Sequence, residues 1–163
     1  MNKRKILVTG SLGQIGSELV MYLRKEYGND NVIASDIEKK DVPKVIGSGP
    51  FEKLDVLKAN KTLEICKKYG VNTVIHLAAL LSAVAEKNPK LAYDINMNGL
   101  YNMLEIAREQ NYTLFVPSSI AAFGPSTLPI KLLKIRFSAR LQCTELQRLQ
   151  VSFFAIIIIK NSE

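Results

Sequence analysis

Long hydrophobic runs are missing from this chain of 163 residues. Its longest uninterrupted apolar stretch, residues 153–159, is far shorter than the ~20 residues that a membrane-spanning helix needs. The N-terminus has no signal-peptide pattern, because a basic segment runs directly into a strand-like one. Cysteine is scarce, and Cys66 and Cys143 have neither metal-site nor disulfide-framework spacing. These absences predict a cytoplasmic protein without a membrane segment, a disulfide or a bound metal.

Acidic residues become scarce toward the end of the chain. Residues 1–130 contain 16 Lys/Arg and 13 Asp/Glu, whereas residues 131–163 contain 6 and 2, so most of the net charge of +7 lies in the last fifth. Before that point the basic residues are scattered through helical patterns and are not clustered on one face, as a nucleic-acid interface would require. We therefore predict a solvated surface and no nucleic-acid partner.

What the chain does contain is an alternation of strand and helix patterns. Short β-rich runs predict strands at 5–9, 31–35, 51–54, 73–77 and 113–117. The spacing of apolar residues predicts helices at 14–26, 58–69 and 89–110, and a loop is expected at 43–50. Repeated β-α-β units predict an α/β fold, a Rossmann-like, doubly wound parallel sheet with helices on both faces. Ligands bind such sheets at the carboxyl ends of the strands.

A glycine pattern follows the first expected strand. Gly10, Gly13 and Gly16 form GxxGxxG between that strand and the first helix. In such a loop the first glycine allows a tight turn, the second lets the backbone approach a pyrophosphate, and the third lets helix and strand pack closely. The phosphates then lie at the helix N-terminus, where free N–H groups favour anions. The pattern in this context predicts a dinucleotide-binding loop.

Acidic residues end the second and third strands. Asp36 lies 20 residues after Gly16, where a carboxylate hydrogen-bonds the adenosine ribose hydroxyls and repels a 2′-phosphate. This position favours NAD over NADP, and the alternative role is a helix N-cap. Asp55 is placed either to reach the adenine amino group or to cap the following helix.

Other polar residues near the strand ends have more than one interpretation. His76, the only histidine, lies within a strand pattern without an acidic partner, so a structural role is favoured over that of a catalytic base. Asn96 and Asn98 interrupt an apolar helix stripe and either hold the strand ends, take part in a proton relay, lie on the surface or are polar groups hydrogen-bonded within the core. Ser119 either hydrogen-bonds a substrate oxygen or is an ordinary strand-end serine.

Together these residues resemble the extended short-chain dehydrogenase/reductase family, also called the epimerase/dehydratase family. The broad resemblance rests on residues 8–16, 31–36 and 54–56. Narrower segments, which resemble the L-threonine 3-dehydrogenases within the family, are 76–83, 94–100 and 116–125. The resemblance implies oxidation of the β-hydroxyl of L-threonine to 2-amino-3-ketobutyrate, with hydride passing to NAD.

The resemblance also implies roles for individual residues. Ser119 takes the position of the catalytic Ser or Thr, and Ser82 faces the amino-acid substrate. The implied NAD-binding residues are Gly10, Leu12, Gly13, Gln14, Ile15, Gly16, Asp36, Ile37, Asp55, Val56, Leu77, Ala78, Ala79 and Asn96. The implied partners are a small-molecule substrate and, for a full-length member, a second copy in a homodimer.

One departure from the family pattern concerns the catalytic pair. The family carries Tyr-x-x-x-Lys about 25 residues after the active-site serine, and the tyrosine oxygen accepts the proton. Thr144 and Arg148 stand there in this chain, and no tyrosine follows Tyr112. The substrate-binding lobe is missing as well, so we expect a truncated Rossmann domain with little or no turnover.

Residues 130–163 resemble the product of a shifted reading frame. Residues 142–148 can be encoded by the permitted codons CAA TGT ACG GAG TTA CAA AGG, chosen to fit. Reading from the last base of the first codon gives Met-Tyr-Gly-Val-Thr-Lys, which restores the missing pair. We therefore expect residues 1–129 to be an incomplete NAD-binding domain and residues 130–163 a non-native tail. The alternative is a native amphipathic element at a membrane surface.

Two rivals to a threonine dehydrogenase stay open. One is a nucleotide-sugar epimerase or dehydratase of the same superfamily, whose sugar pocket lies largely in the missing lobe. Residues 80–83 are the segment that bears on this choice. The other rival is a non-catalytic NAD-binding or regulatory module, which NAD binding without turnover would favour.

Overall fold

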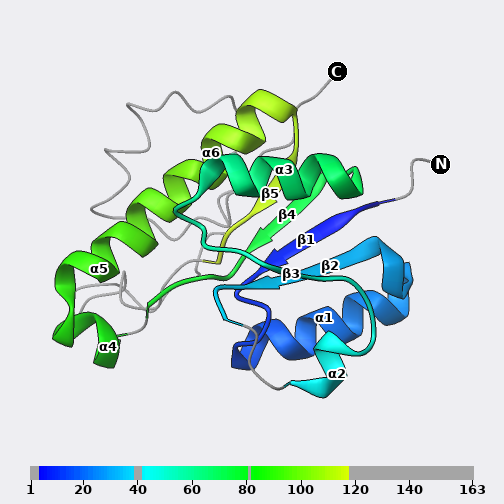
Figure 1. Cartoon of the computed structure of the whole chain (residues 1–163), viewed down its shortest axis with the longest axis horizontal. Coiled ribbons are helices and arrows are strands. Elements are labelled where there is room, and N and C mark those ends of the chain that lie inside the picture. The colour runs from blue at the N-terminus through cyan, green and yellow to red at the C-terminus, as the bar shows by residue number, and fades with distance from the viewer. Residues whose placement is uncertain (1–3, 39–41, 81, 118–163) are drawn as a thin grey trace, which may run out of the picture.

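The structure is a computed structural model that describes residues 4–38, 42–80 and 82–117. Its strands form one sheet in the order β3–β2–β1–β4–β5, with every neighbouring pair parallel. The strands are β1 (Ile6–Thr9), β2 (Val32–Asp36), β3 (Phe51–Lys53), β4 (Thr73–His76) and β5 (Thr113–Phe115). The expected Rossmann-like α/β fold is confirmed, and the carboxyl ends of all these strands meet at one edge (Figure 1).

Helices cover both faces of this sheet. On one face lie α1 (Gln14–Tyr27) and α2 (Pro43–Ile46), and on the other lie α3 (Ala59–Tyr69) and α6 (Gly99–Gln110) (Figure 1). The remaining helical segments are η1 (Asn29–Asn31), α4 (Ser82–Lys87), α5 (Pro89–Tyr93) and the π-helical η2 (Asp94–Asn98). Because the strand order reverses between β1 and β4, the edge beside these two strands is where ligands bind in sheets of this kind.

Two hydrophobic clusters hold the layers together, because successive strand residues point to opposite faces. Leu7 of β1 belongs to the cluster under α3 and α6, while Ile6 and Val8 belong to the cluster under α1 and α2. All residues of β1 are buried, as expected for the centre of a parallel sheet.

The structure corrects several expected elements. Residues 43–50 are not only loop, because Pro43–Ile46 form α2, whose Val45 is fully buried in the cluster beneath α1. The expected helix at 89–110 is interrupted by the π-helical turn η2, so its two halves are α5 and α6. α4 was not expected. Four residues of α2 and six of α4 are too few to show a helical period in the sequence.

A buried arginine joins α1 to the connection between β2 and β3. Arg24 is only 2% exposed, and burial lowers its pKa. Its guanidinium donates hydrogen bonds to the backbone oxygens of Val32, Val45 and Pro50 and to the hydroxyl of Ser48. These oxygens replace the water that the buried charge has lost.

Candidate functional site

The glycine loop turns from β1 into α1 at the carboxyl edge of the sheet. Gly10 has a φ of 68°, and a side chain there would come within 2.7 Å of the Ala78 nitrogen in the turn after β4. A side chain at Gly16 would come within 2.2 Å of the Gly10 oxygen. Both glycines are therefore required by the close packing of the loop against β4 and α1.

Gly13 has no comparable packing reason to be glycine. An added Cβ would meet only the Gly10 oxygen, at 3.3 Å. Gly13 is exposed and is the N-cap of α1, where no side chain caps the helix and the first turn holds no acidic residue. The N-terminal N–H groups of α1 therefore face an open cradle, which suits a phosphate.

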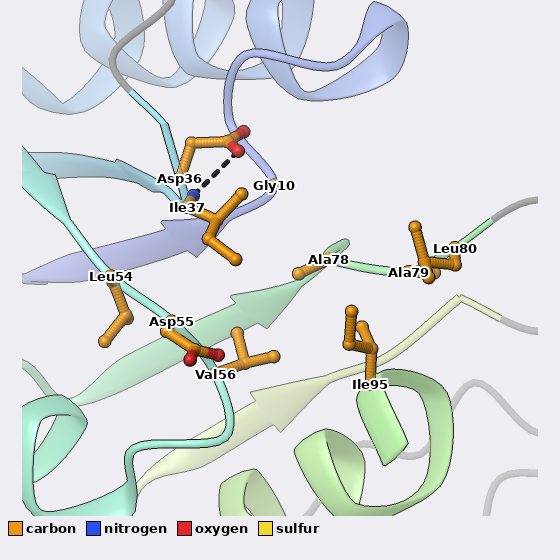
Figure 2. Close-up of a pocket in the computed structure, with 10 residues that line it drawn as sticks. All are labelled: Gly10, Asp36, Ile37, Leu54, Asp55, Val56, Ala78, Ala79, Leu80 and Ile95. Carbon is orange, nitrogen blue, oxygen red and sulfur yellow. Dashed lines mark hydrogen bonds between the residues drawn. The ribbon is translucent and has the colours of Figure 1, made fainter. Parts of the chain in front are cut away.

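The carboxylate of Asp36 lies at the end of β2 and holds the glycine loop. Its Oδ2 accepts a hydrogen bond from the backbone N–H of Leu12 at 2.9 Å, and its Oδ1 accepts one from Ile37 at 2.8 Å, the bond drawn in Figure 2. Asp36 does not cap the next helix, since the N-cap of α2 is Val42. Each carboxylate oxygen has a further lone pair for a ribose hydroxyl.

A solvent-open pocket lies beside Asp36. Its lining comes from the glycine loop, the ends of β2, β3 and β4, and η2 (Figure 2). The expected site residues in the lining are Gly10, Asp36, Ile37, Asp55, Val56, Ala78 and Ala79. Leu54, Leu80 and Ile95 also line the pocket. They lie within the segments 54–56, 76–83 and 94–100 that carry the family resemblance, but they were not predicted as site residues.

Asp55 is held by the turn in which it lies. Its Oδ1 accepts a hydrogen bond from the N–H of Leu57 at 3.0 Å, and its backbone oxygen accepts one from Lys58 at 2.9 Å. α3 begins at Ala59, has Lys58 as its N-cap and has no side-chain cap bond, so Asp55 does not cap this helix. The carboxylate instead belongs to the pocket wall (Figure 2).

Asn96 fastens the segment that follows β4. Its Oδ1 accepts a hydrogen bond from the Leu80 N–H at 2.8 Å, and its Nδ2 donates one to the Leu80 oxygen at 3.1 Å. Both ends of the amide are therefore engaged by backbone. Asn98, by contrast, donates to the Asp94 carboxylate at the helix surface, at 2.9 Å. Of these two asparagines, Asn96 is the one that organises the pocket.

His76 lies beneath the loop and is 4% exposed. Its Nδ1 is 2.8 Å from Thr9 Oγ1, which also accepts a hydrogen bond from the Ala78 N–H at 3.4 Å. Burial lowers the pKa of His76 to about 4, so the ring is neutral at pH 7. Since Thr9 Oγ1 accepts from Ala78, its own proton is available to Nδ1. The pair ties β1 to β4.

A profile of the NAD dependent epimerase/dehydratase family matches residues 6–136. The chain belongs to this family. An uncharacterised epimerase/dehydratase of Staphylococcus saprophyticus is 53% identical over 124 residues, which are 76% of this chain and 39% of that protein.

Two solved structures are also similar to this epimerase/dehydratase chain. An L-threonine dehydrogenase from Clostridium difficile is 55% identical with a TM-score of 0.75, over 82% of this chain and 43% of that one. A UDP-glucose 4-epimerase from Thermus thermophilus, solved with NAD, is 27% identical with a TM-score of 0.60, over 68% of this chain and 36% of that one. The chain spans about two fifths of the length of the relatives that it matches.

Some expected site residues of this epimerase/dehydratase chain lie away from the pocket lining. Gln14 and Ile15 are exposed in the first turn of α1, and Leu77 is half-buried against the cluster beneath α1. Ser82 is the first residue of α4, but its side chain lies outside the described residues, as do Ser119 and the tail from residue 130 onward.

Residues 4–38, 42–80 and 82–117 contain neither a cluster of metal-ligating side chains nor a membrane-spanning helix. In this part of the chain no three His, Cys, Asp or Glu residues come together in a way that could hold a metal ion. No helix there is both long enough and apolar enough to cross a membrane.

Proposed function

We propose that this chain is the NAD-binding part of an oxidoreductase of the L-threonine 3-dehydrogenase type. The observation that carries the proposal is the open cradle at Gly13, directly beside a carboxylate, Asp36, that is already hydrogen-bonded to the same loop. An anion site next to a diol-binding carboxylate fits a pyrophosphate joined to adenosine.

Different residues of the site would hold different parts of the cofactor. The N–H groups of Gln14 and Ile15 at the start of α1 would hold the pyrophosphate, and Asp36 would hold the adenosine ribose hydroxyls. Ile37, Val56 and Asp55 line the part of the pocket that would hold the adenine ring, with the apolar side chains for its faces and the carboxylate for its amino group. When bound, NAD supplies the acceptor for a hydride removed from the substrate.

The preference for NAD over NADP follows from Asp36. A 2′-phosphate would lie against this carboxylate, and like charges at such a distance disfavour binding. Calorimetry on the full chain is expected to show NAD binding about tenfold or more tightly than NADP. Equal affinity for the two dinucleotides would contradict this assignment.

Gly13→Ala tests the cradle itself. Among the described residues the added methyl group meets only the Gly10 oxygen, at 3.3 Å, so a shift of a few tenths of an ångström accommodates it, but it occupies the place where a phosphate would approach. We expect NAD affinity to fall about tenfold or more, with little change in the free energy of unfolding. Ser17→Ala, which removes a hydroxyl bonded to Gln14 one turn later, is the matched control and should leave affinity unchanged. Unchanged affinity in Gly13→Ala would remove the support for a pyrophosphate at this loop.

L-threonine as the substrate is supported by sequence similarity. Identity to the Clostridium difficile L-threonine dehydrogenase is 55%, against 27% to the Thermus thermophilus UDP-glucose 4-epimerase. The rival assignment to nucleotide sugars is tested on a frame-restored, full-length protein offered L-threonine and UDP-sugars in parallel. NAD reduction that depends on L-threonine supports the proposal, and turnover of a UDP-sugar alone overturns it.

We further propose that the 163-residue chain does not turn over, because Thr144 and Arg148 replace the catalytic Tyr and Lys of the family. Residues 130–163 are proposed to be the product of a frame shift near codons 125–132. The nucleotide sequence of that interval tests the shift directly. NADH formation from L-threonine by the purified chain would overturn the proposed inactivity, and NAD binding alone would leave a non-catalytic binding module.

A further inference from the structure

The two side walls of the pocket come from different β-α turns, and one helical rod contacts both of them. The first wall is residues 78–80 after β4, and the second is residues 54–56 after β3. The rod consists of α5, η2 and α6, which follow one another without a break from Pro89 to Gln110. Asn96 of η2 fastens the first wall through the two hydrogen bonds to Leu80.

The second wall is fastened by Asn102 of α6. Its side-chain Nδ2 donates a hydrogen bond of 3.1 Å to the backbone oxygen of Val56. Gly99, three residues earlier and therefore on the same face of the helix, lies directly against the Val56 side chain. A Cβ at Gly99 would come within 2.9 Å of Val56 Cγ2, so the helix backbone approaches this wall as closely as a glycine permits.

The position of Val56 matters for the neighbouring carboxylate. Val56 is buried, and its branched side chain has little rotational freedom with which to absorb a displacement. Asp55 precedes it in the same tight turn, whose bonds run from the Leu57 N–H to the Asp55 carboxylate and from the Lys58 N–H to the Asp55 oxygen. A shift of the Val56 carbonyl therefore carries the Asp55 carboxylate with it.

We propose that Asn102 is a positioning residue that sets where Asp55 and Val56 stand at the adenine end of the pocket. Asn102 does not touch the ligand and acts through the Val56 carbonyl. Asn96 does the same for the opposite wall, so the rod fixes the width of the pocket from both sides. This inference rests on the proposed NAD site, since adenine is the group that Asp55 and Val56 would contact.

The test uses the full chain and two dinucleotides, NAD and nicotinamide hypoxanthine dinucleotide. The second has a carbonyl in place of the adenine amino group. It therefore lacks the N–H donor whose hydrogen bond the Asp55 carboxylate would accept. Wild type is expected to bind NAD about tenfold more tightly than this analogue, because an unpaired polar group is left in the pocket. Asn102→Ala is expected to weaken NAD binding by about fivefold to tenfold and to reduce the preference to about twofold.

A second variant and a control accompany Asn102→Ala. Gly99→Ala pushes on Val56 from the helix side, and we expect the same loss of preference from it. Asn98→Ala removes an exposed asparagine that bonds only Asp94 among the described residues and should keep wild-type affinity and preference. If Asn102→Ala does not fold, the NAD affinity and the dinucleotide preference of Gly99→Ala test the inference.

The outcomes separate the inference from the proposed function. If wild type binds neither dinucleotide, the NAD site itself is wrong and the inference falls with it. If wild type binds NAD and both variants keep its affinity and preference, the inference alone is wrong. An equal weakening of both dinucleotides together with a lower melting temperature would show a merely structural asparagine, and would also overturn it.

Discussion

Two buried serines beside the glycine loop differ in one hydrogen bond. Ser11 and Ser35 are both 0% exposed. The Ser35 hydroxyl donates to the Val8 backbone oxygen at 3.1 Å, whereas the Ser11 hydroxyl has no partner among the described residues. A buried polar group without a partner costs about 1–3 kcal/mol, so the two hydroxyls contribute to stability with opposite sign.

Replacing each serine by alanine should therefore shift stability in opposite directions. Ser11→Ala removes an unsatisfied hydroxyl and is expected to raise the free energy of unfolding by about 1 kcal/mol. Ser35→Ala removes a satisfied one and is expected to lower it by about 1 kcal/mol. Urea unfolding of the three proteins measures both changes. A destabilisation of equal size in Ser11→Ala would mean that this hydroxyl is also hydrogen-bonded.

His76 makes the stability of the fold depend on pH. Its folded-state pKa of about 4 lies below the unfolded value of 6.5, so the unfolded chain binds the proton more readily. This contribution to stability is complete above pH 6.5 and is lost as the pH falls from 6.5 toward 4, by up to about 1.4 kcal/mol per pH unit. His76→Asn should show a flatter decline between pH 7 and pH 5 in urea unfolding. Parallel curves for the two proteins would show that His76 is not the titrating group.

The residues that could be predicted from sequence are those whose role is set by local spacing. Gly10, Gly16 and Asp36 stand at fixed distances within one β-α-β unit, so their placement at the sheet edge follows from the chain itself. Asn102 and Asn98 cannot be told apart in this way. Both are asparagines in one helical pattern, and only the approach of the Val56 turn gives Asn102 a partner.

Among the helices, α1 depends on Arg24 for its attachment to the β2–β3 connection. The guanidinium reaches acceptors in β2, α2 and the segment before β3 because it presents donors along two edges. A lysine has three donors at a single point, so Arg24→Lys leaves buried carbonyls unpaired. We expect a loss of about 2–4 kcal/mol in the free energy of unfolding.

The matched control for Arg24 is Arg108→Lys in α6. Arg108 is exposed and forms ion pairs with Glu105 and Glu109 on the helix surface, where such pairs contribute little. Urea unfolding of both variants compares their changes in the free energy of unfolding. Equal stability changes would mean that the buried hydrogen bonds of Arg24 do not hold the connection in place.

The elements that could be predicted are those long enough to show a period. β1 and β2 are short apolar runs, and α1, α3 and α6 have apolar stripes that face the sheet. The turn η2 could not be predicted, because a π-helical insertion changes the register without changing residue type. α2 forms because Val45 is buried beneath α1, and such a tertiary contact leaves no trace in a four-residue pattern.

Over the chain as a whole, the parallel sheet and its ligand-binding edge could be predicted from the β-α-β alternation, but Leu54, Leu80 and Ile95 were not predicted to line the pocket. Its lining draws on the loop at Gly10, the turn at Asp55 and the helical residue Ile95, which are far apart in sequence. They meet because β1 lies between β2 and β4 and brings the carboxyl ends of these strands together.

Among the residues that the structure describes, those that line the pocket lie between Gly10 and Ile95, and both buried clusters end before Pro117. Removal of residues 130–163 should therefore leave NAD affinity within about twofold and the free energy of unfolding within about 1 kcal/mol. Calorimetry and urea unfolding of the chain ending at Pro129 check both values. A tenfold loss of affinity or a large destabilisation would identify residues 130–163 as a native part of the fold. That result would contradict a frame-shifted origin for the tail, since a segment read out of frame has no reason to complement this surface.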